Sequence, residues 1–433
     1  MIDRNLVDSS YGDRMDSKSI NWFGSIKITE LLWIVGFNLL IFQNPIQSAF
    51  PFTGYFDEMA TLCLLIAAVS AVIQVKGKRE LLSRFGRLAL LCLLLLVAVG
   101  LLGNYYFKIQ TGARPILIDV YACTKFAIAF ISGSVALEDK ERVYVALAWE
   151  IKILILIMIP FAILNQFIDM GMRYDRRYAL WSFQFIFGHP SSMAAILSGF
   201  SLLLLVDYKK NRLWTTLCWL LIVLGLRSTS IAFVGASIVV ISLGDSSQRL
   251  RMSQVLLIAA VALYIGWSQF QYYYFSTDGS ARAELTSVAV EIANKYSPLG
   301  SGFATYGSNI TAQPGYYSML YFQYGLSSVF GLEPGNTMFL SDTFWPIVIG
   351  QFGWLGLLLF VLCLFFLYKG VSTELKMHTS SNKILFLMFA YLLLSSLGGS
   401  SFFHPMAVLF AMCGSLANAE LIRHSADNAP AHR

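Results

Sequence analysis

The sequence predicts an all-α polytopic integral membrane protein with about twelve transmembrane helices. Of its 433 residues, 57% are hydrophobic and only 13% are charged, and the mean hydropathy is +0.63. Soluble domains carry about 25% charged residues, so a soluble fold is excluded. The net charge of +6 comes from basic residues scattered along short polar links. The distribution of these basic residues indicates the membrane topology. We therefore expect the protein to bind the lipid bilayer and not nucleic acid.

The expected helices are apolar stretches of the length that crosses a membrane, which is about 20 residues. The seventh and eighth are short and form a tight hairpin that turns at Leu226-Arg-Ser-Thr. By residue number the twelve predicted spans are 29–43, 57–75, 88–107, 115–136, 143–165, 182–206, 213–226, 229–243, 254–270, 344–367, 384–402 and 405–422.

The polar links between these spans predict the topology. With the N-terminus inside, most of the 31 lysines and arginines lie in inside loops and the two tails, as the positive-inside rule requires. Both termini are then cytoplasmic in a bacterial inner membrane. Residues 1–433 form a single membrane domain. A polar stretch at 271–343, between the ninth and tenth spans, is its one large periplasmic or extracellular loop.

Motifs for soluble cofactor chemistry are missing from the sequence. The six cysteines fall inside apolar spans without a CxxC or Cys/His cluster, so neither a disulfide framework nor a metal site is expected. No Walker, GxGxxG or HExxH motif is present, and we expect no cofactor. The first twenty-odd residues lack the apolar core of a cleaved signal peptide.

Inside the large loop, residues Asp278 to Tyr296 are expected to form a helix. Asp278 or Ser280 could cap its start, and apolar residues recur at helical spacing after them. Arg282 lies one turn in, where Glu284 or Asp278 could pair with it. The following Pro298-Leu-Gly-Ser-Gly is expected to end the helix and supply a flexible turn.

Arginines in the predicted outside segments are the candidate binding residues. Arg173, Arg176 and Arg177 cluster after the fifth span, Arg227 lies at the tip of the short hairpin, and Arg282 lies on the loop helix. Guanidinium groups stay charged and bind phosphate in a bidentate manner, so converging arginines suit a diphosphate. The alternatives are contacts with lipid headgroups, pairing with Asp175, or a salt bridge within the loop helix.

Three further polar residues have less specific interpretations. His189 precedes Pro190 near the outer start of the sixth span, where a hydrogen-bonded structural histidine is as good a reading as a binding residue. Asp119 and Lys125 lie six apart in the fourth span and therefore on different helix faces. We expect them to find separate partners.

The layout resembles the superfamily of O-antigen polymerases (Wzy) and O-antigen ligases, which also includes exopolysaccharide polymerases. Within roughly residues 180–360, the resembling stretches surround the large loop in the expected order. They are Phe187-Gly-His-Pro-Ser-Ser-Met-Ala-Ala, Leu226-Arg-Ser-Thr-Ser, Arg282 with Ser297-Pro-Leu-Gly-Ser-Gly-Phe-Ala-Thr-Tyr, and Ser341-Asp-Thr-Phe-Trp-Pro-Ile-Val-Ile-Gly-Gln-Phe-Gly-Trp-Leu-Gly.

The resemblance implies a metal-independent, GT-C-like glycosyltransferase whose donor is a glycan on polyprenyl diphosphate. Arg227 and Arg282 would hold the diphosphate, and Asp342 would orient or deprotonate the acceptor hydroxyl. The alternative role for Asp342 is a cap on the tenth span. The resemblance also places substrate contacts at a second group of residues. These are Arg173, Arg176, Arg177, His189 and Tyr306.

One departure from the family pattern bears on the reaction. Ligases of this superfamily typically carry a histidine late in the large loop, and residues 271–343 contain none. We therefore expect a polymerase of O-antigen, capsule or exopolysaccharide, with a flippase and a chain-length regulator as possible partners. The alternatives are a ligase of the same superfamily, a transporter or flippase for the same lipid-linked sugar, and a non-catalytic assembly partner.

Overall fold

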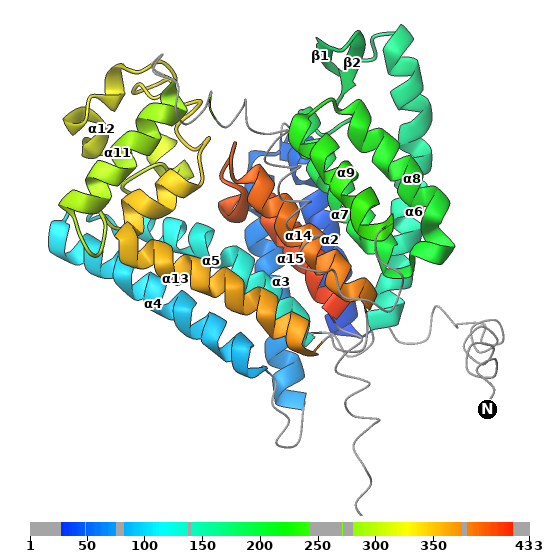
Figure 1. Ribbon diagram of the computed structural model, residues 1–433, viewed down its shortest axis with the longest axis horizontal. Helices are drawn as coiled ribbons and strands as arrows, with labels where there is room; N and C mark the ends of the chain where they lie inside the picture. Colours follow the sequence, from blue (N-terminus) through cyan, green and yellow to red (C-terminus); the bar gives the residue numbers. More distant parts are fainter. Residues whose placement is uncertain are drawn as a thin grey trace, which may run out of the picture.

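A computed structural model of the chain is largely helical (Figure 1). It describes residues 27–47, 49–74, 82–136, 140–242, 271, 280–374 and 379–418. The expected all-α class is confirmed apart from one small β-hairpin. The predicted ninth span, 254–270, lies outside the described residues.

Three groups of elements make up the described fold (Figure 1). The first group places α4, α5 and the long α13 beneath the polar segment 280–343, which we call the lobe. A second group holds α6 to α9 and the hairpin, and a third lies between them. The first group has the bounds α4 Arg84–Phe107, α5 Ala113–Ala136, α11 Ala281–Lys295, η3 Asn309–Ala312, α12 Met319–Gln323, η4 Leu326–Ser328 and α13 Trp345–Glu374.

The other two groups are bounded as follows. The second contains α6 Lys140–Phe167, β1 Arg173–Arg177, β2 Leu180–Phe183, α7 Pro190–Leu204, η2 Leu205–Asp207, α8 Tyr208–Leu224 and α9 Ser228–Ser242. The central group contains α2 Ile28–Gln47, η1 Pro51–Tyr55, α3 Phe56–Gln74, α14 Thr379–Ser395, η5 Ser401–Phe403 and α15 Pro405–Asn418.

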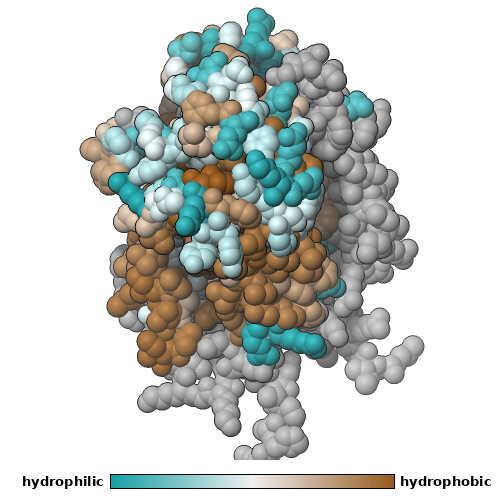
Figure 2. Space-filling model, turned by 90° about the vertical axis from the view of Figure 1, so that its left-hand side faces the viewer, coloured by the Kyte–Doolittle hydropathy of each residue, from teal (hydrophilic) through white to brown (hydrophobic). Residues whose placement is uncertain are grey.

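The molecule carries an apolar outer surface where a membrane protein needs one. Figure 2 shows a band of hydrophobic side chains below the polar lobe, with a smaller polar patch beneath the band. Leu94 on α4 and Phe365 on α13 are two of the exposed apolar side chains of the described residues, at 59% and 49% exposure. Lipid tails cover such a band at no cost, whereas water does not.

Six described helical segments are long and apolar enough to cross a membrane. Three shorter apolar helices, Ser228–Ser242, Ser381–Ser395 and Pro405–Leu416, accompany them. The structure is therefore that of a helical membrane protein, and the count of twelve spans stays a prediction. The six segments are Pro51–Ile73, Arg84–Phe107, Ala113–Ala136, Lys140–Phe167, Pro190–Leu224 and Trp345–Gly370.

The predicted sixth span starts too early. Residues 182–206 were expected to be one helix, but α7 begins at Pro190. Before it, β1 and β2 pair antiparallel, with Arg176 opposite Trp181 and Arg177 opposite Leu180. Residues 182 and 183 read as the start of a span, but they belong to β2, which runs from an exposed Leu180 to a buried Phe183. Apolar content alone does not separate a short strand from a helix end.

The lobe begins with the expected helix, and the capping residue is Ser280. Its side chain accepts a hydrogen bond from the backbone N–H of Ala283, which is the N-cap arrangement. Leu285, Val288 and Ile292 are buried, as their helical spacing predicts. They pack with Tyr306, Leu320, Tyr321, Leu326, Leu332 and Leu340 in a core of the lobe's own.

The segment after α11 ends the helix as expected, and most of its glycine-rich part, which was predicted to be a flexible turn, is buried. Residues 300–308 are all buried. The carboxyl of Asp119 on α5 accepts from the N–H of Ala304 at 2.6 Å, and the side-chain oxygen of Asn104 on α4 accepts from the N–H of Phe303 at 2.8 Å. Gly302, at φ +95°, passes close to Asn104. Here glycine allows the backbone to approach Asn104 closely and to adopt a left-handed conformation.

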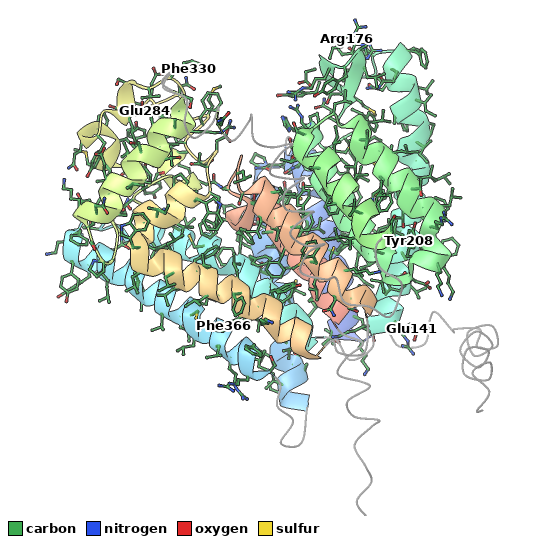
Figure 3. All side chains as sticks on the ribbon, viewed as in Figure 1. Glu141, Arg176, Tyr208, Glu284, Phe330 and Phe366 are labelled. Carbon is green, nitrogen blue, oxygen red and sulfur yellow. The ribbon has the colours of Figure 1, made fainter. Side chains whose placement is uncertain are left out.

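The hairpin and the lobe lie at the same end of the bundle, which we call the lobe end. Figure 3 shows Arg176 of the hairpin and Glu284 and Phe330 of the lobe at this end, with Glu141 and Phe366 toward the other. The predicted topology put the two segments on one side of the membrane. Which end faces the cytoplasm stays a prediction.

Candidate functional site

Arg227 lies in the link between α8 and α9, at the lobe end. Leu226 before it takes a left-handed conformation with φ +50°, and the Arg227 carbonyl accepts the first hydrogen bonds of α9, from Ser230 and Ile231. The side chain is only 14% exposed and lies 3.5 Å from an oxygen of Asp175. Shielding a cation from water to this extent costs solvation free energy unless a nearby negative charge compensates it.

Asp175 on β1 provides that compensation and joins two arginines. Its Oδ2 accepts from Nε of Arg177 at 2.7 Å, and its Oδ1 faces Nη2 of Arg227. Burial raises the pKa of Asp175, but the hydrogen bond from Arg177 and the charge of Arg227 more than offset this and lower it below the ordinary value. The carboxyl is therefore ionised at neutral pH.

Arg227 keeps unused hydrogen-bonding capacity. Its Nε and Nη2 atoms are shielded from solvent and have no hydrogen-bond partner among the described residues. Its guanidinium lies 5.2 Å from the ring centre of Tyr174, a cation–π contact. Buried donors normally find partners. These two nitrogens are therefore available to an anionic ligand.

The hairpin divides the three predicted arginines between two places. Arg177 joins Asp175 and Arg227, whereas Arg173 and Arg176 lie over the ring of Trp181, at 4.9 and 5.8 Å. Arg173 also donates from Nε to the Asn165 carbonyl at 2.6 Å. The sequence suggested one cluster, but the strand register puts Arg173 and Arg176 on the Trp181 side.

His189 caps the start of α7 and faces the same cluster. Its Nδ1 accepts from the N–H of Ser191 at 3.1 Å, and its ring stands edge-on to Tyr174 at 4.7 Å. Burial lowers the pKa of His189, and the charge of Arg227 lowers it further, against weaker raising effects of Asp175 and Asp342. The neutral ring therefore carries its proton on Nε2, which makes that atom a donor.

Arg282 on α11 forms an ion pair that the sequence did not suggest. Its Nη2 donates to Oδ2 of Asp342 at 2.6 Å, with side-chain exposures of 19% and 35%. The sequence offered only Glu284 and Asp278 as partners, and Asp278 lies outside the described residues. The pair joins the lobe helix to the stretch that enters α13, so both predicted residues lie at one point of the lobe.

Tyr306 is buried completely inside the lobe. Its hydroxyl donates to the Leu285 carbonyl at 2.6 Å, and its ring packs against Tyr321. Burial raises the pKa of the phenol well above its ordinary value. With no exposed surface, Tyr306 acts in the packing of the lobe, and we leave it out of the proposed site.

Asp119 and Lys125 do have separate partners. Asp119 binds the backbone of the lobe segment at Ala304, whereas the Lys125 ammonium contacts Asp57 at 2.6 Å in a buried ion pair. Gln43 donates to the other carboxylate oxygen of Asp57 at 3.1 Å. Both contacts connect elements of the bundle and support the fold around the site.

Tyr174 and Asp175 are the residues of the cluster that the sequence underrated. Asp175 was considered only as a neutralising partner, and Tyr174 was not singled out. The signal was present, because Tyr174 and Asp175 sit among three arginines directly before the expected sixth span. Recognising it required the hairpin, which turns these residues toward the α8–α9 link.

A scan against protein-family models finds no match to this chain, and a search of curated proteins finds none either. The resemblance to the O-antigen polymerase and ligase superfamily therefore stays a prediction from the quoted residues.

Proposed function

We propose that this protein is a polysaccharide polymerase that transfers a growing glycan from polyprenyl diphosphate to a lipid-linked repeat unit. The observation that carries the proposal is the convergence of Arg177 and Arg227 on Asp175, with two buried nitrogens of Arg227 unused. Fixed positive charge with free donors suits a diphosphate. A diphosphate bound at the surface of an apolar bundle belongs to a lipid-linked substrate.

In this proposal Arg227 and Arg177 bind the donor diphosphate. Nε2–H of His189 supplies a further hydrogen bond from the same side, because its Nδ1 is already occupied by Ser191. Negative charge develops on the diphosphate as the glycosidic bond breaks. Donors already in place around that charge stabilise the transition state more than the ground state.

Asp342 is the proposed partner of the acceptor hydroxyl. The hydroxyl oxygen attacks the anomeric carbon, the bond from that carbon to the diphosphate oxygen breaks, and the electron pair leaves with the diphosphate. The hydroxyl proton passes to the Asp342 carboxylate and then to solvent. Arg282 holds this carboxylate in place, and at 35% exposure it is open to an acceptor. As in the family that the chain resembles, the transfer needs no metal and no cofactor.

The remaining predicted residues receive other roles. Arg282 orients Asp342 and leaves diphosphate binding to the hairpin side. Arg173 and Arg176 lie over Trp181, where contact with lipid headgroups is a sufficient role. The proposal places the reaction at the outer face of a bacterial inner membrane, with the lobe as part of the active site.

The glycan ladder of cells that lack the gene tests the proposal. Cells complemented with wild type or with Arg176→Ala should show long chains. Cells complemented with Arg227→Ala should show a single repeat unit on its lipid or core acceptor. Arg176 is the matched control because it is a hairpin arginine outside the Asp175 cluster.

Each competing function predicts a different glycan pattern in these cells. Loss of all surface glycan in the deletion strain, with lipid-linked polymer still made, would identify a ligase. Accumulation of lipid-linked repeat units on the cytoplasmic face would identify a flippase. A normal glycan ladder from cells with Arg227→Ala would contradict the proposed diphosphate site at Arg227.

A further inference from the structure

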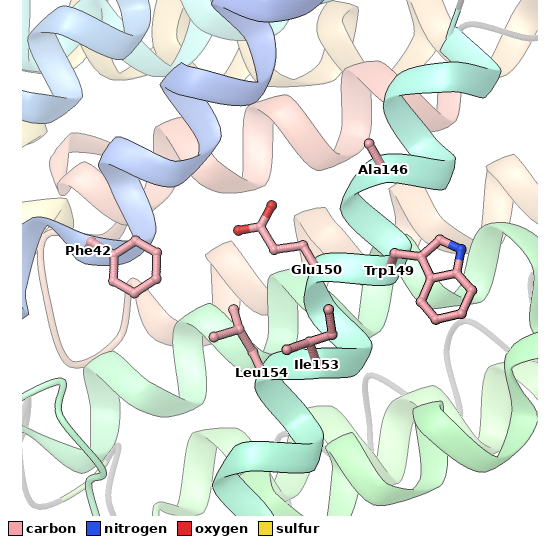
Figure 4. A pocket seen from close by; sticks show the side chains of 6 residues that line it. All are labelled: Phe42, Ala146, Trp149, Glu150, Ile153 and Leu154. Carbon is pink, nitrogen blue, oxygen red and sulfur yellow. The ribbon is translucent and has the colours of Figure 1, made fainter. Parts of the chain in front are cut away.

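A groove between α2 and α6 contains a carboxylate inside the membrane-spanning part of the fold. The groove has a volume of about 660 Å³ and is lined by Phe42, Ala146, Trp149, Glu150, Ile153 and Leu154. Figure 4 shows Glu150 extending toward α2, while the Trp149 indole extends from the other side of α6. One carboxylate oxygen of Glu150 accepts from the Asn38 amide at 3.2 Å.

A second ionisable side chain lies close by on the same helix. Lys152 is half-buried, with its ammonium 5.7 Å from the centre of the Trp149 ring. Neither Glu150 nor Lys152 forms an ion pair with any residue that the structure describes. Both are about 15–18 Å along the helix from Lys140, near the middle of a hydrocarbon core about 30 Å thick.

Charges at this depth are expensive next to lipid and usually have a partner. The two residues flank an exposed stripe on α6, made of Trp149, Ile153 and Leu156 at 60%, 54% and 60% exposure. The stripe continues at Pro160 and Ile163, which are also exposed. Its spacing of four, then three, residues is that of a seam between two parallel helices.

We propose that this face of α6 binds a second copy of the chain. Around a two-fold axis along the membrane normal, two α6 helices face each other in parallel. The flank with Glu150 on one copy then meets the flank with Lys152 on the other copy, and the pairing repeats on the opposite side. The two residues differ in depth by about 3 Å, which a lysine side chain can span.

The dimer explains three observations together. It gives each intramembrane charge an opposite partner, it covers the apolar stripe, and it fills the open groove beside Asn38 with a lysine side chain. Lipid would cover the stripe but would give neither Glu150 nor Lys152 an opposite charge. The inference is independent of the proposed enzymatic function, because it uses no residue of the Asp175 cluster and no residue of the Arg282–Asp342 pair.

Cross-linking of full-length protein in its native membrane tests the contact. Ile153→Cys should form a disulfide-linked or bis-maleimide-linked dimer. Leu94→Cys, on α4 at 59% exposure, is the matched control and should stay monomeric. Cross-linking of Ile153→Cys only to another polypeptide, or to nothing, would overturn the proposal.

Charge exchange tests the pairing itself. In vesicles that contain the purified protein, subunit counting should show dimers for wild type. Glu150→Lys and Lys152→Glu should each weaken association at least tenfold, since each places like charges in contact. The double variant should restore it to within a few-fold, and this rescue separates lost pairing from misfolding. A double variant as weak as the single variants, or a monomeric wild type, would contradict the dimer.

Discussion

The two arginine–aspartate pairs at the lobe end differ in how fully their hydrogen bonds are used. Arg282 and Asp342 are joined by a hydrogen bond of 2.6 Å. Arg227 and Asp175 lie 3.5 Å apart, and two nitrogens of Arg227 have no hydrogen-bond partner among the described residues. The first pair holds the lobe to the entry of α13. The second keeps a largely shielded cation in place while Nε and Nη2 of Arg227 make no hydrogen bond within the described residues, as a site for an anion requires.

The surroundings of the two pairs reinforce this difference. The lobe is attached to the bundle by a buried segment whose backbone bonds Asn104, Asp119 and Gln351. The first strand of the hairpin, β1, carries three arginines, a tyrosine and an aspartate. The lobe is rigidly packed, whereas the hairpin side has polar atoms without hydrogen-bond partners among the described residues. We infer that the lobe positions Asp342 and that the hairpin side binds the diphosphate. The predictions below test that division.

The largest expected effect is on the docking of the lobe. Gly302→Val would place a Cβ 2.6 Å from the backbone nitrogen of Asn104 and force a side chain into φ +95°. We expect a loss of about 2–5 kcal/mol from the left-handed conformation and overpacking together. Thermal unfolding and limited proteolysis of the lobe would measure it.

Gly315→Ala is the control for Gly302→Val. Gly315 has φ +87° but nothing within 4 Å of the added atom. Only the backbone cost of about 1–2 kcal/mol should appear. Equal losses in the two variants would mean that the close approach to Asn104 contributes nothing to docking.

Arg227→Ala should weaken binding of inorganic diphosphate by about 10- to 100-fold, the value of one charge-assisted contact of about 1.5–3 kcal/mol. Arg176→Ala should change it less than twofold. Calorimetry on protein in nanodiscs would measure both. Equal weakening by the two substitutions would show general attraction to a basic surface and no defined site.

The two aspartates should respond in opposite ways to neutralisation. Asp175→Asn removes the negative charge between Arg177 and Arg227, and we expect diphosphate to bind several-fold more tightly. Asp342→Asn breaks a partly exposed pair and should lower the free energy of unfolding by about 0.5–1 kcal/mol, with diphosphate affinity unchanged. Weaker binding by Asp175→Asn would mean that this carboxylate is needed to position the arginines.

The smallest expected effect concerns the protonation of His189. Its pKa is lowered below 6.5 by burial and by Arg227, so the folded protein binds fewer protons than the unfolded chain near that pH. The contribution of His189 to the free energy of unfolding should therefore fall as the pH drops through 6.5. Histidine NMR should place its midpoint below 6.5, and Arg227→Gln should raise it. An unchanged midpoint in Arg227→Gln would mean that the charge of Arg227 does not influence the pKa of His189.

The sequence predicted the helices well because apolar length is a local property. Each predicted span within the described residues overlaps a helix, although the first two residues of the sixth, 182 and 183, belong to a strand. Ser280 and the buried face of α11 followed from capping and helical spacing. The burial of residues 300–308 could not be predicted, because it depends on Asn104 and Asp119 in distant helices.

The candidate site was predicted only as a set of residue types. Charge placement identified Arg227, Arg177 and Arg282 as exceptions to the positive-inside rule. The two ion pairs could not be predicted from the sequence. Asp342 is 60 residues from Arg282 in the chain, and Asp175 comes close to Arg227 through the pairing of β1 with β2. Tyr306 lies in a resembling stretch that suggested substrate contact, and its complete burial in the lobe favours a packing role.

Chain growth by purified protein in vesicles tests the central claim most directly. A polyprenyl-diphosphate-linked repeat unit, supplied on the side of the lobe, would be the only substrate. The account predicts that wild type and Arg176→Ala form longer lipid-linked glycans and release polyprenyl diphosphate, and that Arg227→Ala does neither. If wild type moves the repeat unit across the vesicle membrane without lengthening it, the protein is a transporter and the polymerase proposal is wrong.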